Sequence, residues 1–342
     1  MIPPDRRSPG SAEGSFGGRR KGRQPMSASF RVDMTAQAQA LRGFEKAPVS
    51  LGLYALLRGE HDRIILTGSG ASHLAAVPGW QRLVAAGRTA VWTDARHLID
   101  SPSLITDDSL LVTTSRSGMS TDVIGLLKGF TDRHRPAGII AVTDDVASPL
   151  AAAADGEILL RSQSSQSPKG FLNALAAHDY IASMILGEDN DDIASTARVV
   201  ATTTCPADVL KLASDTTASH GSRLAYVGFG EHAATSLYAA LLTREATLIS
   251  ATGYAGNDFG HDDVAAADST LTAVLFAGRA RANNVRARTL ATDLARSGAR
   301  VLVIGDVNID EIPTIRSPAG HLSAQVAHSV MIAEHFVSSL AA

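Results

Sequence analysis

Short apolar runs and longer amphipathic segments alternate along most of this chain of 342 residues. In the first half the apolar runs are three to five residues long, are bounded by Gly, Ser or Asp, and lie at 63–66, 90–92, 109–112, 138–142 and 157–160. Segments with helical spacing, such as 75–86 and 123–133, separate most of them. Short buried strands that alternate with helices are typical of a parallel sheet covered on both faces. The pattern therefore predicts an α/β fold.

The same alternation begins again in the second half, after long helical stretches at 171–186 and 191–219. We expect strands at 225–228, 247–250, 270–276 and 301–304, and helices at 231–245 and 281–295. Residues 66–71 (LTGSGA) are similar to 226–231 (YVGFGE), and residues 137–144 (AGIIAVTD) are similar to 299–306 (ARVLVIGD). Such echoes indicate an internal repeat. We predict two three-layer α/β/α domains, each built on a parallel five-stranded sheet.

These patterns also predict how the chain is divided. We expect a disordered tail over 1–33, an N-terminal helical segment over 34–60 and a first sheet domain over 61–187. A connecting helix over 188–220 then leads into a second sheet domain over 221–342.

Composition limits the classes of protein to which the chain can belong. Without an uncharged apolar run of about 18 residues, no membrane span is expected. Its one cysteine, Cys205, excludes an internal disulfide framework and a multi-cysteine zinc site, which fits the reducing cytoplasm. The net charge of −3 divides into +4 for residues 1–25 and −7 for the rest. The basic segment is either a nucleic-acid-binding arm or a disordered extension, and its Gly- and Ser-rich composition favours the extension.

Three loops of the first half are candidates for binding an anion. The first loop (68–72), second loop (115–121) and third loop (162–169) each carry small hydroxyl residues just before a helical segment. Free backbone N–H groups and hydroxyls at such positions converge on phosphates, although each loop alone could be a helix cap or turn. A Walker A lysine pattern is missing, and His73 stands where a dinucleotide-binding loop has its third glycine. We predict a phosphate or phosphosugar site.

Residues 115–122 (SRSGMSTD) resemble the S-x-S-G-x-[ST]-x-[DE] signature of sugar isomerase (SIS) domains. Residues 70–72 are similar to the first phosphate loop of that family, and residues 167–171 (SPKGF) are similar to its third. In the second half, 228–231, 242–245 and 256–261 resemble the isomerase half of glucosamine-6-phosphate synthase and related aminosugar-phosphate enzymes. The resemblance covers about 35–342 and implies a tandem SIS protein. It implies that the substrate phosphate is held by Ser72, Ser115, Arg116, Ser117, Ser120, Ser167 and Lys169.

Glu245 is a candidate acid and base. By helical periodicity it shares a stripe with Tyr238, Leu242 and Leu248, which predicts a carboxylate on the core face of its helix. Desolvation there would raise its pKa and suit it to proton transfer, whereas the alternative is a structural carboxylate paired with an arginine. The resemblance implies that Glu245 moves the proton between C1 and C2 of an open-chain sugar phosphate.

His261 follows Glu245 by 16 residues, the spacing of the catalytic glutamate and histidine in the family, and is expected in a loop. The resemblance implies that it promotes ring opening from across the interface of a homodimer with a shared active site. Two departures are Asp262-Asp263, where the family has Gly-Pro, and the absence of any lysine after Lys211. The second excludes a covalent mechanism through a C-terminal lysine. No metal or redox cofactor is implied, since no second histidine lies at ligand spacing from His261.

Together these features favour an enzyme that acts on an amino sugar 6-phosphate or a phosphorylated amine adduct. Its reaction would be aldose–ketose isomerisation, or a deamination or deglycation linked to it. The alternative is a non-catalytic sugar-phosphate sensor that regulates a protein partner. Transcriptional sensors with SIS domains carry a helix-turn-helix module, and residues 1–33 are too short and too Gly-rich for one, so we expect no nucleic-acid partner.

Overall fold

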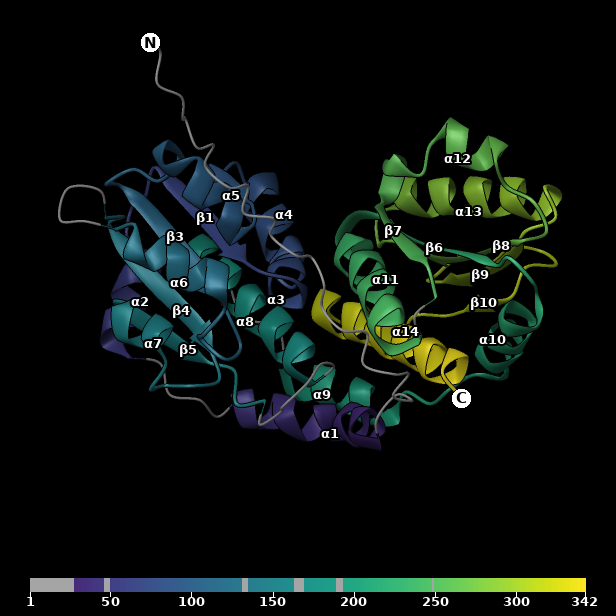
Figure 1. The fold of residues 1–342 in the computed structure, drawn as a ribbon, viewed down its shortest axis with the longest axis horizontal. Coiled ribbons are helices and arrows are strands. Elements are labelled where there is room, and N and C mark those ends of the chain that lie inside the picture. The colour runs from purple at the N-terminus through teal and green to yellow at the C-terminus, as the bar shows by residue number, and fades with distance from the viewer. Residues whose placement is uncertain (1–27, 46–49, 131–134, 163–168, 189–192, 248) are drawn as a thin grey trace, which may run out of the picture.

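The computed structural model describes residues 28–45, 50–130, 135–162, 169–188, 193–247 and 249–342. In this part of the chain, two parallel five-stranded sheets form two lobes (Figure 1). The strands of the first sheet are β1 (Arg63–Gly68), β2 (Ala90–Trp92), β3 (Ser109–Thr114), β4 (Gly138–Thr143) and β5 (Gly156–Leu159). Those of the second are β6 (Arg223–Gly228), β7 (Ala251–Ala255), β8 (Leu271–Phe276), β9 (Arg300–Ile304) and β10 (Thr314–Ile315).

Both sheets have the same topology. The strand order is β2-β1-β3-β4-β5 in the first and β7-β6-β8-β9-β10 in the second, and every pairing is parallel. The central strands β3, β4 and β8 are buried along their whole length, as their continuous apolar runs require in a sheet covered on both faces. The predicted α/β fold with two duplicated five-stranded sheets is confirmed.

Helices cover both faces of each sheet. In the first lobe these are α2 (Leu51–Arg58), α3 (Ala71–Leu74), α4 (Val77–Ala85), α5 (Ala95–Asp100), α6 (Thr121–Lys128) and α7 (Pro149–Ala153), with the 3-10 turn η1 (Pro102–Leu104). In the second they are α10 (Ala207–Ala218), α11 (Ala233–Thr247), α12 (His261–Ala265) and α13 (Arg281–Arg296), with η2 (Gly230–His232) and η3 (Gly256–Asp258). No helix of the described residues is both long enough and apolar enough to span a membrane.

The two lobes share one hydrophobic core. Helices α1 (Ala28–Glu45), α8 (Lys169–Leu186), α9 (Ile193–Thr202) and α14 (Leu322–Leu340) lie between and below the sheets in Figure 1. Phe171 at the start of α8 stacks on Tyr238 of α11, with ring centroids 3.7 Å apart. The Tyr238 hydroxyl donates to the buried carboxyl of Glu334 on α14 (3.2 Å), which Gln37 of α1 also contacts (2.5 Å). Packing and a polar network therefore join the two halves.

Three expected boundaries differ in the structure. Helix α1 begins at Ala28, within the segment expected to be a tail, because Phe30 is buried; residues 1–27 lie outside the described part. The connecting helix expected over 188–220 is two helices, α9 and α10, because Pro206 lacks an N–H group and disfavours helical geometry in the residue before it. The strand expected at 247–250 begins only at Ala251. Helix α11 extends to Thr247, whose hydroxyl donates to the Thr243 carbonyl (2.7 Å) one turn earlier.

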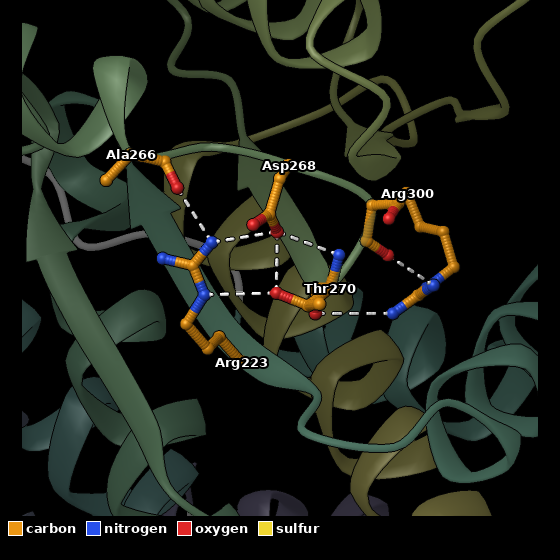
Figure 2. A network of polar contacts seen from close by, with 6 residues as sticks. Arg223, Ala266, Asp268, Thr270 and Arg300 are labelled. Carbon is orange, nitrogen blue, oxygen red and sulfur yellow. Dashed lines mark hydrogen bonds and ion pairs between the residues drawn. The ribbon is translucent and has the colours of Figure 1, made fainter.

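A polar network closes the amino edge of the second sheet (Figure 2). The Arg223 guanidinium, at the start of β6, donates to the Ala266 carbonyl (2.7 Å) and to Asp268 (3.0 Å). Asp268 also accepts from the Thr270 N–H (2.9 Å) and hydroxyl (2.6 Å). Arg300, at the start of β9, donates to the carbonyls of Ser269 and Thr270. These contacts stabilise the amino edge of the sheet. The candidate functional residues belong to the opposite, carboxyl edge, where loops lead into helix N-termini.

Candidate functional site

The first and second loops meet at the carboxyl edge of the first sheet. The Ser120 hydroxyl of the second loop donates to the Ser69 hydroxyl of the first (3.2 Å). Ser72 and Ser120 are half-buried, Ser117 is exposed and Ser115 is buried. The structure thus brings four of the predicted phosphate-binding serines onto two touching loops.

Glycine is required within the second loop. Gly118 has φ +60°, and a Cβ atom there would lie 2.0 Å from the Ser148 hydroxyl at the start of α7. The end of β4 also holds the second loop. The Arg116 carbonyl accepts hydrogen bonds from the hydroxyl of Thr143, the last residue of β4 (3.1 Å), and from the N–H of Asp144, which follows it (2.8 Å). These contacts therefore fix the backbone of the second loop.

The third loop begins beside the second. The Ser162 N–H (2.7 Å) and its hydroxyl both donate to the carboxylate of Asp144. Ser167 lies outside the described residues, and of Lys169 only the backbone, as the first residue of α8, is described. The Arg116 side chain crosses the start of α8, since a Cβ on Gly170 would lie 2.8 Å from its Cδ.

This arrangement favours a bound anion. The three loops lead into the N-termini of α3, α6 and α8, where the backbone N–H groups of the helices carry partial positive charge. With serine hydroxyls and the Arg116 guanidinium beside them, the loops offer the donors that a phosphate needs.

Helix α11 brings the second half to this edge. It contacts α3, and its Tyr238 packs on Phe171 next to the start of α8. Glu245 lies seven residues after Tyr238, about two turns further along the helix. It is close enough to Tyr238 that its charge helps to raise the pKa of the Tyr238 phenol. The proposed acid–base residue thus stands on the helix that touches the anion loops.

The expectation that Glu245 lies on a core face was wrong. Tyr238 and Leu242 on the same stripe are buried, but Glu245 is exposed. Ala246, the next residue, still packs against the core, so the exposure is local to Arg244 and Glu245. Partial desolvation still raises the pKa of Glu245, and the charge of Arg244 opposes that shift.

His261 is the first residue of the short helix α12 rather than a loop residue, and its side chain lies outside the described part of the structure. The segment around it is anchored by Tyr254. This ring packs edge-on against Phe259 (centroids 4.8 Å apart), and its hydroxyl donates to Asp263 of α12 (3.2 Å). Asp263, a departure from the family pattern, therefore has a structural contact.

Two buried histidines beneath the loops were missed by sequence reasoning. His73 was noted only as a departure from a glycine pattern, and His178 of α8 was not singled out. Both rings are largely or fully buried. Among the described residues, no group of three or more His, Cys, Asp or Glu side chains is arranged to hold a metal ion.

Comparison with known proteins shows what part of the chain, and its fold, are similar to. Residues 56–184 match the SIS domain. The fold is similar to that of the C-terminal domain of glucosamine-fructose-6-phosphate aminotransferase from Francisella tularensis (TM-score 0.76, 17% identity, 92% of this chain and 95% of that chain). It is also similar to tagatose-6-phosphate ketose/aldose isomerase from Escherichia coli (0.73, 19%, 93% and 94%) and to glucosamine-6-phosphate deaminase from Thermotoga maritima (0.65, 17%, 92% and 93%). No sequence among the curated proteins matches.

Proposed function

We propose that this chain, in which residues 56–184 match the SIS domain and the two-sheet fold is similar to that of phosphosugar isomerases, is an enzyme of phosphosugar metabolism. We propose that it isomerises an amino sugar 6-phosphate, or deaminates or deglycates one through an isomerisation step. The observation that supports this most is the meeting of the serine-rich loops with the helix that carries Glu245.

The loops would hold the substrate phosphate. The hydroxyls would come from Ser72, Ser115, Ser117 and Ser120, and the positive charge from Arg116. Further contacts would come from Ser167 and Lys169 of the third loop. Because the chain beyond residue 25 carries −7, attraction of an anionic substrate must come from these local donors rather than from the overall field.

Glu245 would move the proton between C1 and C2. A carboxyl whose pKa is raised takes a proton from a carbon acid more readily than an ordinary glutamate and returns it to the neighbouring carbon. His261 would promote ring opening in the active site of a partner subunit, so we propose a homodimer, acting in the cytoplasm. The absence of lysine after Lys211 leaves this proton transfer without a Schiff base from the C-terminal segment.

Solvent isotope exchange tests the reaction. A panel of hexosamine 6-phosphates and 6-phosphorylated amine adducts is incubated with the protein in D2O, and deuterium at C1 and C2 is followed by NMR. Glu245→Gln is expected to lower the exchange rate by about 10²–10⁴-fold while binding persists. Glu157→Gln, an exposed carboxyl on β5, is the matched control and should exchange at the wild-type rate. Tight binding without any exchange would establish the non-catalytic sensor instead.

Mixing tests the shared site. Glu245→Gln and His261→Ala variants, each inactive alone, are mixed under conditions that allow subunits to exchange. If His261 acts in the partner's site, mixed dimers regain activity, because one of their two sites has both residues. A fully active monomer in analytical ultracentrifugation would overturn the shared site.

A further inference from the structure

Beneath the anion loops lies a buried hydrogen bond between an α8 histidine and the end of β3. His178 Nε2 is 2.8 Å from the Thr114 hydroxyl, and both side chains are fully buried. Thr114 is the last residue of β3 and directly precedes Ser115 of the second loop. The bond therefore ties the middle of α8 to the residue from which the second loop departs.

The first and second loops both begin near this point. His178 belongs to α8, which the third loop enters, and His73 directly follows Ser72 of the first loop. The His73 ring stacks on Trp92 (centroids 4.2 Å apart, planes 6° apart), and its carbonyl accepts from the Trp92 indole N–H (2.9 Å). Burial lowers the pKa of His178, and His73 is near enough to add to that shift. We call His73, Thr114 and His178 the loop anchor.

The two imidazoles are uncharged. Burial lowers the pKa of His178 to about 3 and, against the charge of Asp94, that of His73 to about 4. The Nδ1 atom of His178 has no partner among the described residues. The tautomer of His178 decides whether Nε2 or the Thr114 hydroxyl donates, and the bond joins the same two residues in either case. The anchor thus acts by position rather than by charge.

The second half of the chain keeps the histidines but loses the bond. Gly68 pairs with Thr114 across β1 and β3, and Gly228 pairs with Phe276 at the same place in β6 and β8. His232 follows Gly228 and stacks on Phe276, with ring centroids 6.3 Å apart. His328 of α14 is close enough to shift the pKa of His232. Phe276, which has no hydroxyl, therefore stands in the second half where Thr114 stands in the half that carries the serine loops.

We propose that His178 is a positioning residue that, through Thr114, holds the second loop in the geometry that binds the phosphate group of the substrate. The proposal rests on the proposed function for its ligand. The hydrogen bond fixes the carboxyl end of β3, and with it the direction of the N–H groups and hydroxyls of the second loop. Its loss affects the binding of phosphate-bearing ligands and leaves the proton transfer at Glu245 intact.

The test compares three substitutions in the full-length protein. His178→Leu removes the imidazole, Thr114→Val removes the hydroxyl, and His178→Gln places a side-chain amide near the position of Nε2. Binding of inorganic phosphate and of the best phosphosugar of the panel is measured by calorimetry and by tryptophan fluorescence, to which Trp80 and Trp92 both contribute. We expect about three- to tenfold weaker binding and a matching rise in KM for His178→Leu and Thr114→Val, with kcat unchanged. The double variant should be no worse than either, and His178→Gln should recover most of the affinity.

His328→Leu is the matched control, since it removes the corresponding histidine of the second half and should leave phosphate binding unchanged. If His178→Leu fails to fold, Thr114→Val and His178→Gln still decide. Wild-type binding of a phosphosugar with unchanged affinity in the variants would overturn the anchor and leave the proposed function standing. Weaker phosphate binding in the variants, in a protein that binds no phosphosugar, would support the anchor and overturn the proposed function. No binding of either ligand by the wild type would overturn both.

Discussion

The two halves of the molecule share a sheet and differ in the loops at its carboxyl edge. In the first half, serine-rich loops follow β1 and β3, and their hydroxyls touch each other. In the second half the loop after β8 is Ala-Gly-Arg-Ala, and the N–H of its Arg279 donates to Glu231 of η2 (2.7 Å). The chain's own carboxylate thus takes an amide that would otherwise be available to an anion. Identical topology therefore does not imply identical binding, because the loops decide which sheet edge can receive a phosphate.

The comparison treats the two halves as parts of one folding unit. Tyr238→Ala is the strongest test of that view. It removes the ring that stacks on Phe171 and leaves the buried Glu334 without its phenol partner. We expect a loss of about 3–5 kcal/mol in the free energy of unfolding, measured with urea. Tyr238→Phe, which keeps the ring, should cost only about 1 kcal/mol. Two wild-type transitions, with only one changed by Tyr238→Ala, would show that the halves unfold independently.

Glu334 distinguishes the long helix of the second half from that of the first. Helix α8 anchors α1 with a neutral amide, Asn173, which donates to the Ala40 carbonyl (3.0 Å), whereas α14 uses a carboxyl. Burial raises the pKa of Glu334 to about 8, although Gln37 and Tyr238 oppose the shift. Between about pH 4.5 and 8 the folded protein holds a proton that the unfolded chain has lost, so stability falls as pH rises through this window.

Glu334→Gln should remove that pH dependence. Its stability relative to the wild type is expected to grow from pH 5 to pH 8, reaching on the order of 3 kcal/mol, and then to level off. Urea unfolding at several pH values measures the difference, with Glu157→Gln as the exposed control. A constant difference across the range would mean that Glu334 is already ionised in the folded protein at pH 5.

Much of the fold, and part of the site, can be predicted from the sequence. The central strands were predicted because every position in them is buried, which leaves short apolar runs such as Leu110–Val112 and Ile139–Val142. Strand β10 was missed because it has two half-buried residues and so leaves no pattern. The 247–250 strand was wrong because β-branched residues favour strands on average, whereas here a threonine hydroxyl is satisfied within the helix.

The site shows a similar division. Glycine and serine motifs predicted the first two loops, since tight turns and hydroxyl donors leave local signals. The exposure of Glu245 could not be predicted, because helical periodicity gives a direction and not the extent of the neighbouring lobe. The hydrogen bond of His178 to Thr114 joins residues 64 positions apart, and no local pattern identifies such a partner.

Glycines at matching positions sharpen the comparison further. Gly68 and Gly228 end β1 and β6, and an added Cβ would lie 2.7 Å from the Thr114 carbonyl oxygen in the first case and 2.0 Å from the His232 carbonyl oxygen in the second. Since both obstacles are backbone, Gly228→Ala should cost about 2–3 kcal/mol and Gly68→Ala about 1 kcal/mol less. Gly43→Ala in α1, where nothing lies within 4 Å, should instead stabilise the protein by about 0.5–1 kcal/mol. Urea unfolding of the three variants ranks the changes in the free energy of unfolding. Equal losses for Gly68→Ala and Gly228→Ala would mean that the backbone after β6 shifts as readily to accept a Cβ as the backbone around Gly68.

The smallest effect on stability is expected at the amino edges of the two sheets, where the halves also differ. Arg63, at the start of β1, donates to one carbonyl, that of Leu104, whereas its counterpart Arg223 is part of the network around Asp268. Hydrogen bonds from Thr270, together with the Arg223 guanidinium, lower the pKa of Asp268 to about 2. The stabilisation from this carboxylate is therefore complete above about pH 4 and is lost as pH falls toward 2.

Asp268→Asn should lower the melting temperature slightly at pH 7, and its curve of melting temperature against pH should converge with that of the wild type near pH 2. Because the carboxylate is fully exposed, the difference should shrink in high salt. Asp108→Asn, in the loop before β3, should change nothing, and melting curves of Asp268→Asn that match the wild type at every pH would show that this network contributes no stability.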